Sequence, residues 1–179
     1  MNISRLCILA LSCLLPWVAA SQADETPNQV TPLGSFSSIN EDAEHCNGEA
    51  LDVWRIGNTF VGLFHTCAGT TGDTITAVAS VRQFDATTHA VVFEGALSRG
   101  MDYLKGGVQT PSKDHFSFKG TISGDEIVGS LSWIDENYPT HKPKAATLHL
   151  RRKSVQLPGF ATQAEWSRYA TNLSGPRFP

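Results

Sequence analysis

The feature that most constrains this chain is an alternation of apolar and polar residues that recurs from about residue 50 to residue 152. Successive side chains of a strand point to opposite faces, so this period of two indicates strands with one buried face. Turn signals such as Gly57-Asn58 and Ser123-Gly124-Asp125 separate the runs, as expected of antiparallel hairpins. The expected strands span residues 34–39, 51–56, 60–67, 75–84, 89–97, 116–122, 127–133 and 145–152.

Seven to eight short strands joined by hairpins predict a mainly β protein, a small antiparallel up-and-down β-barrel. The outline resembles the broad group of lipocalin-like and avidin-like secreted barrels, in architecture alone. The Gly-x-Trp opening typical of lipocalins is absent from Gly34-Ser35-Phe36, so the pattern assigns no family.

One short C-terminal helix is expected over residues 162–173. Thr162 and Glu165 have the spacing of a capping box, and Trp166, Tyr169 and Leu173 recur at helical spacing. Such a helix would plug the barrel or form a pad against the sheet.

The first 23 residues have the pattern of a secretory signal peptide. Arg5 precedes an apolar run of about a dozen residues, and small residues follow that permit cleavage after Ala20 or Ala23. A membrane anchor would need about twenty apolar residues. The prediction is therefore export to the periplasm or beyond, with a polar segment at 24–48, a barrel at 49–153 and a C-terminal segment at 154–179.

Loss of Arg5 with the signal leaves 13 basic and 17 acidic side chains, a net charge of −4. This mild acidity gives no electrostatic reason to expect nucleic acid or an anionic membrane as partner. No further membrane span is expected.

Cleavage would also remove Cys7 and Cys13, leaving Cys46 and Cys67 as the only pair. Two cysteines in one exported domain predict a disulfide, which would stabilise the fold by about 3 kcal/mol. The alternative is a weak metal site made by His45, His65 and Glu44, but the histidines have no metal-ligand spacing.

No catalytic constellation is evident, so neither catalytic residues nor a cofactor are expected. The chain has no G-x-S-x-G elbow. Asp114 and His115 are adjacent, and adjacent strand residues point to opposite faces, which argues against a direct acid–base pair.

Two connections are the candidate functional segments. Residues 98–113 form a long loop for a compact domain, and residues 135–144 form a second. Their placement at the same or opposite ends of a meander depends on the strand count. The candidate partner-binding residues are Met101, Asp102, Tyr103, Lys105, Tyr138 and His141. The alternative is that Tyr103 and Leu104 fold back to cover a barrel end.

The leading hypothesis is an exported, non-enzymatic protein that recognises another protein through these loops, as an inhibitor or an immunity protein does. A second hypothesis is a carrier of a small apolar ligand inside the barrel. A third is an exported hydrolase or metalloenzyme with scattered residues. The second predicts a hollow interior lined by Phe60, Phe64, Phe116, Phe118, Leu131 and Trp133.

Overall fold

The computed structural model describes residues 29–72, 74–98 and 100–174, and the signal peptide expected at 1–23 lies outside these described residues. The elements are, in chain order, β1 (Val30–Ser37), β2 (Asn40–Glu41), β3 (His45–Ile56), β4 (Thr59–Thr70), β5 (Ile75–Asp85), β6 (Ala90–Leu97), β7 (Met101–Tyr103), β8 (Gln109–Pro111), β9 (Asp114–Ser123), β10 (Glu126–Asp135), β11 (Lys144–Lys153) and α1 (Gln163–Ser174).

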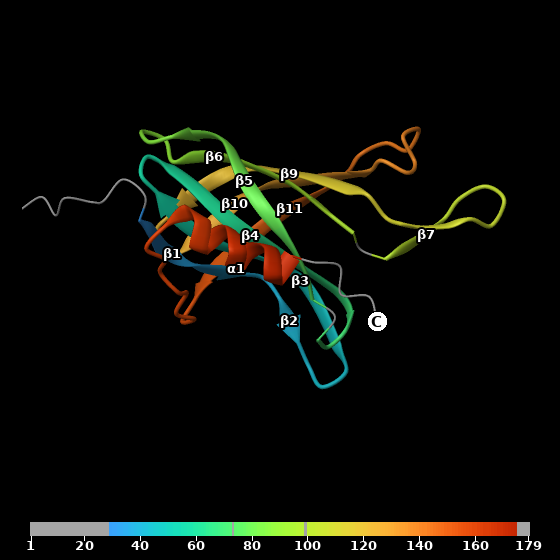
Figure 1. Ribbon diagram of the computed structural model, residues 1–179, viewed down its shortest axis with the longest axis horizontal. Helices are drawn as coiled ribbons and strands as arrows, with labels where there is room; N and C mark the ends of the chain where they lie inside the picture. The colour runs from blue at the N-terminus through green and yellow to red at the C-terminus, as the bar shows by residue number, and fades with distance from the viewer. Residues whose placement is uncertain (1–28, 73, 99, 175–179) are drawn as a thin grey trace, which may run out of the picture.

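Eight strands close into one antiparallel barrel (Figure 1). They pair in the order β1, β3, β4, β5, β6, β9, β10, β11, and β1 pairs with both β11 and β3. Each barrel strand thus neighbours the barrel strand that follows it in the chain, which is an up-and-down meander. The predicted mainly β barrel with one C-terminal helix is confirmed.

The first barrel strand begins earlier than the alternation suggested. β1 lies within the 24–48 segment that was expected to precede a barrel at 49–153, yet it pairs on both of its edges. Its register with β3 shifts between Pro32 and Gly34, and proline has no amide hydrogen to give to a ladder. This bulge interrupts the period of two, so the sequence pattern predicted only the later part of this strand, at 34–39, and missed its start at Val30.

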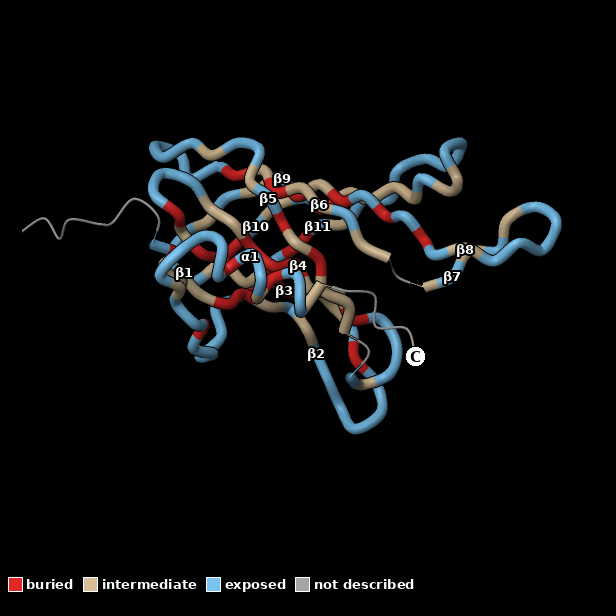
Figure 2. The backbone as a smooth tube through the Cα atoms, viewed as in Figure 1, coloured by how far each residue is buried: buried red, intermediate tan, exposed pale blue. Residues whose placement is uncertain are grey.

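Apolar side chains fill the interior of the barrel, and Figure 2 shows the buried residues along the barrel strands. A methyl group on Gly129 would clash first with the Lys119 carbonyl oxygen and would also come within 2.7 Å of the Phe118 ring, so this position requires glycine. The buried members of this core are Phe36, Leu51, Val53, Phe64, Ala77, Ala79, Val91, Phe93, Phe116, Phe118, Ile127, Leu131, Leu148 and Leu150.

A second apolar cluster joins α1 to the outer face of β3, β4 and β5. The buried Trp54 ring lies 6.1 Å from the Trp166 ring and 6.2 Å from the Tyr169 ring. The helix runs from 163 to 174, and Thr162 and Glu165 cap its start: the Glu165 amide donates to Thr162 Oγ1 at 3.2 Å, and the Glu165 carboxylate accepts from the Ala161 amide at 2.9 Å. The helix is therefore a pad on the outside of the barrel and not a plug.

Candidate functional site at the open end of the barrel

The connections between barrel strands alternate between two ends of the barrel. Turns at residues 57–58, 86–89 and 124–125 lie at one end, which we call the closed end. The connections that follow β1, β4, β6 and β10 lie at the other, which we call the open end. In a closed eight-stranded meander, every second connection returns to the same end. The two candidate loops are therefore neighbours (Figure 1).

Part of the long connection after β6 is a regular hairpin. β7 and β8 pair as a separate two-stranded sheet, and Gly106 and Gly107 turn the chain with φ angles of 90° and 77°, a region that favours glycine. Tyr103 is 67% exposed. It therefore does not fold back to cover the barrel end, as the alternative reading of this loop required.

The β10–β11 connection braces this hairpin. Asn137 Nδ2 donates to Asp102 Oδ2 at 2.6 Å and to the Pro111 carbonyl at 2.9 Å. The Tyr138 hydroxyl donates to the Tyr103 carbonyl at 3.0 Å. These contacts join residues about 26 to 35 positions apart, so the two loops form one structural unit, and a hairpin held in this way loses less entropy on binding.

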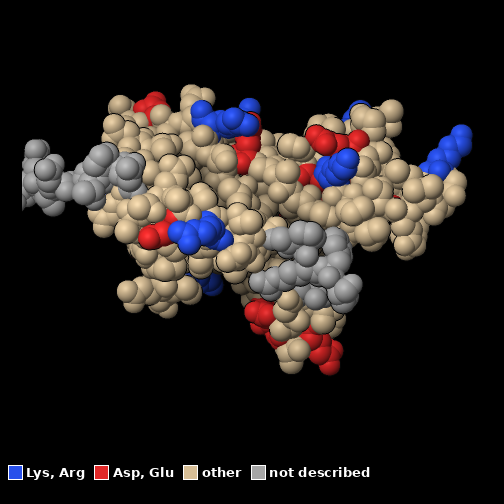
Figure 3. All heavy atoms as spheres, viewed as in Figure 1, with Lys and Arg blue, Asp and Glu red and all other residues tan. Residues whose placement is uncertain are grey.

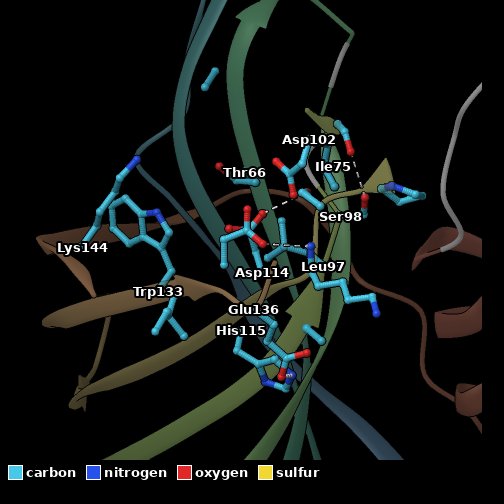
Figure 4. A pocket seen from close by; sticks show the side chains of 18 of the residues that line it. Thr66, Ile75, Leu97, Ser98, Asp102, Asp114, His115, Trp133, Glu136 and Lys144 are labelled. Atoms are coloured by element: carbon cyan, nitrogen blue, oxygen red, sulfur yellow. Dashed lines mark hydrogen bonds and ion pairs between the residues drawn. The ribbon is translucent and has the colours of Figure 1, made fainter. Parts of the chain in front are cut away.

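A groove of about 1260 Å³ opens beside the braced loops. Its lining comes from the β4–β5 side of the open end, from the start of β7, from the β10–β11 loop and from the last residues of α1. Figure 4 shows Trp133 and Lys144 on one side of this space, Ser98 and Asp102 on another, and Asp114 between them. Both acidic and basic side chains border the groove, together with aromatic rings.

The floor of the groove is the layer of inward-pointing side chains nearest the open end, which we call the top layer of the barrel interior. Glu49, Thr66, Asp114 and Trp133 point inward above the apolar core and surround a cavity of about 30 Å³. Such a volume holds about one water molecule. Asp114 is only 2% exposed, and it accepts a hydrogen bond from the Ser112 hydroxyl at 3.1 Å.

The aromatic residues proposed as walls of an apolar ligand site instead pack on one another. Phe64, Phe116, Phe118 and Leu131 are buried members of the core, and the Phe64 and Phe116 rings stack at 4.6 Å. Small barrels are commonly filled by their own side chains, and this interior follows that rule below its top layer.

The six predicted partner-binding residues fall into two groups at the open end. Met101, Asp102, Tyr138 and His141 line the groove, and the Tyr138 and His141 rings stack at 5.0 Å. Tyr103 and Lys105 lie outside it, toward the turn of the β7–β8 hairpin, and both are exposed. The sequence pattern did not identify Asn137, which joins the two loops, because its partners become apparent only in the fold.

Comparison of the chain with protein-family models, with curated proteins and with solved structures finds no match to any of them. The functional argument for this chain therefore depends on its own residues and their geometry.

The predicted disulfide is present. Cys46 and Cys67 join β3 to β4 with a Cα–Cα distance of 5.7 Å. They lie where these two strands reach the open end, next to a hairpin tip that carries Glu41, Asp42 and Glu44.

The histidines near the disulfide do not form a metal site. His45 lies 3.8 Å from Asp42 at the exposed tip, whereas His65 lies on the outer face of β4. Within the described ranges, no group of three or more His, Cys, Asp or Glu side chains could hold a metal ion.

The sequence did not predict a set of hydrogen-bonded polar side chains on the outer face. His65 Nε2 lies 3.1 Å from Asp52 Oδ2, and His65 Nδ1 lies 2.9 Å from Thr76 Oγ1. The three residues lie on adjacent strands, so their hydrogen bonds join β3, β4 and β5. Burial raises the pKa of nearby Tyr169, and the charge of Asp52 adds to that effect. The register His65↔Thr76 produces this cluster, and spacing along the chain does not reveal it.

Asp114 and His115 point in opposite directions, as expected for adjacent strand residues. Asp114 faces the barrel interior, whereas His115 is exposed and its Nε2 lies 3.1 Å from Glu136 Oε1.

Among the described residues, no helix is long and apolar enough to cross a membrane.

Proposed function

We propose that this chain is an exported, non-enzymatic binding protein that holds a segment of another protein in the groove at its open end. The observation that carries this proposal is the convergence of two distant connections. They meet at one end, are tied by the Asn137 and Tyr138 hydrogen bonds, and border a groove of about 1260 Å³. An inhibitor of an exported enzyme or an immunity protein fits this description.

The size and lining of the groove support a macromolecular occupant. Pockets for small molecules usually measure about 300–1,000 Å³. This groove is larger and borders on both charged and aromatic side chains. Aromatic and other large side chains on rigid loops are typical anchors in protein recognition.

The barrel interior gives less support to the carrier hypothesis. An apolar ligand inside the barrel would need space that Phe64, Phe116 and Phe118 occupy, and the cavity above them measures about 30 Å³. Export is supported by the signal pattern of residues 1–23 and by the Cys46–Cys67 disulfide.

The test is capture of partners from the exported fraction of the source organism by three immobilised proteins: the wild type, Met101→Asp and Val155→Asp. Met101 lines the groove, whereas Val155 is an exposed valine that follows β11 at the closed end. A partner should be retained by the wild type and by Val155→Asp, and reduced at least about tenfold by Met101→Asp, since a buried unpaired charge costs more than 1.4 kcal/mol. The same recovery by all three proteins, or no partner for the wild type, would contradict the proposal.

A further inference from the structure

The tip of the β7–β8 hairpin differs from an ordinary solvated turn. Residues 103–108 read Tyr-Leu-Lys-Gly-Gly-Val, with no acidic residue and no side-chain amide. Turns are rich in Gly, Pro, Asn, Asp and Ser, and this one has two glycines but no polar residue of that set. Here the backbone closes the turn by itself, because the Leu104 amide donates to the Val108 carbonyl at 2.8 Å and the Gly107 amide donates to the Leu104 carbonyl at 3.1 Å.

This tip presents apolar surface to solvent. The described residues include five exposed large hydrophobic side chains, and three of them lie on this hairpin: Met101 at 44%, Tyr103 at 67% and Val108 at 57%. No atom lies within 4 Å of a methyl group built on Gly106 or Gly107. The tip therefore projects into open space, away from the barrel (Figure 2). Exposed apolar surface of this kind marks a contact site.

The cations near the tip are available to a partner. Lys105 is on the turn, Lys142 is on the neighbouring connection at the edge of the groove, and both are exposed. In the parts of the chain that the structure describes, no ion pair joins them to a carboxylate. Figure 3 shows a basic side chain at the end of this hairpin, whereas the β2–β3 hairpin ends in acidic side chains and points in another direction.

The acidic residues of the two loops are held by contacts within the protein. Asp102 accepts a hydrogen bond from the side-chain amide of Asn137, and Asp135 accepts one from the backbone amide of Asn137 at 2.9 Å. Glu136 pairs with His115. Although the whole chain is mildly acidic, the surface that extends furthest along this hairpin is apolar and cationic.

We propose that the tip of the β7–β8 hairpin docks on an anionic lipid membrane. Tyr103, Leu104 and Val108 enter the interfacial region, and Lys105 contacts the lipid headgroups while its aliphatic stem lies along the apolar boundary. Tyrosine suits this depth because its ring is apolar and its hydroxyl is polar. Screening limits the attraction between Lys105 and the anionic surface to about one Debye length.

This docking is separate from partner binding in the groove. Tyr103, Lys105 and Val108 do not line the groove, so the tip can contact a membrane while the groove holds a protein. The Asn137 and Tyr138 contacts keep the tip and the groove in a fixed relation.

The test is co-sedimentation of the disulfide-bonded protein with vesicles of phosphatidylcholine and phosphatidylglycerol, and with vesicles of phosphatidylcholine alone, at low and high salt. The wild type should bind the phosphatidylglycerol vesicles, and salt should weaken the binding. Lys105→Glu should bind about 25-fold more weakly, since each lysine near an anionic surface contributes about fivefold and reversal acts twice. The double variant Tyr103→Ser with Val108→Ser should lose binding by a similar factor.

Matched controls use the same changes elsewhere on the surface. Val155→Ser alters an equally exposed valine, and Lys119→Glu alters an exposed lysine on β9. Both should bind vesicles within about twofold of the wild type, since surface substitutions away from a contact change little.

Two results would overturn the membrane proposal. One is a wild-type protein that binds no vesicle at low salt. The other is equal binding by the tip variants and their controls. If the tip variants instead lose a captured protein and leave vesicle binding unchanged, the tip contacts a protein. Loss of partner capture in Met101→Asp without any vesicle binding by the wild type would leave the groove proposal standing and refute this one.

Discussion

The two ends of this barrel are built differently. At the closed end, connections of two to four residues join the strands, and Arg152 ties the β9–β10 turn to the wall: its Nε lies 2.8 Å from Asp125 Oδ1, and its guanidinium lies 4.7 Å from the centre of the Phe36 ring. At the open end, the connection after β4 has four residues, but those after β6 and β10 are longer, include a hairpin, and are joined to each other by side-chain contacts.

This difference shows how an up-and-down barrel can separate the parts that stabilise the fold from the loops for which we propose a role in recognition. Short turns and a core of phenylalanine rings hold the closed end and the middle, so the open end can vary in length without loss of the fold. Long surface loops cost little in stability, because loop-closure entropy grows slowly with length. Recognition surfaces on such a scaffold collect at the end where the long connections lie.

The largest expected contrast lies between a core ring and a loop ring. Phe93 is fully buried in the barrel, whereas Tyr103 is 67% exposed at the open end. We expect Phe93→Ala to lower the free energy of unfolding by about 4 kcal/mol, through lost burial and a cavity. Tyr103→Ala should change it by less than about 0.5 kcal/mol. Urea unfolding of both variants measures this, and similar losses would refute the division between the two regions.

The disulfide gives the next largest effect, and it acts at the open end. Replacing Cys46 and Cys67 together by alanine removes a link between positions 21 residues apart. The free energy of unfolding should fall by about 3 kcal/mol, mainly because the unfolded chain gains freedom. Thermal unfolding of the double variant and of the reduced wild type should agree. A variant as stable as the oxidised protein would show that the open end needs no covalent link.

A smaller effect is expected from the brace between the two loops. Asn137→Ala removes the hydrogen bonds to Asp102 and to the Pro111 carbonyl. It should cost about 1 kcal/mol and speed amide hydrogen exchange in β7 and β8, but not in the closed-end turns. Thr140→Ala, an exposed change in the same loop, is the control. Unchanged exchange in β7 and β8 would mean that the hairpin holds its position without the brace.

The smallest expected effect is a loss of fold stability at low pH, to which both ends of the barrel contribute. Amides of Glu44 and His45 lower the pKa of Asp42 at the open end, and amides of Thr87 and Thr88 lower the pKa of Asp85 at the closed end. Because the folded-state pKa lies below the unfolded value, each carboxylate stabilises its turn at neutral pH. That contribution disappears as the pH falls below about 4 through the folded pKa.

An NMR titration of the amides that donate to these two carboxylates measures both pKa values. Their midpoints should fall below the usual value for aspartate, and the transition at Glu44 and His45 should vanish in Asp42→Asn. A midpoint at or above that value at either end would contradict the assigned hydrogen bonds.

The disulfide pairing and the barrel class were predictable from the sequence and are confirmed by the structure, whereas export stays a prediction. Each depends on a local or compositional pattern: a charged start before an apolar run, two remaining cysteines, and a period of two between short turns. The C-terminal helix was predictable for the same reason, because the Thr162–Glu165 cap and the apolar stripe are short-range signals. The strand β1 was only partly recognised, since its bulge between Pro32 and Gly34 interrupts the period.

The tertiary structure alone decided which distant residues share a site. Strand count placed the loops that contain Asp102 and Tyr138 at one end, and cross-strand register placed His65 beside Thr76. The tertiary structure also decided that the interior is filled, because ring stacking such as Phe64 on Phe116 depends on how the strands twist and close. Local patterns are encoded within a few residues of the chain, whereas the groove and the hairpin tip depend on closure of the whole barrel.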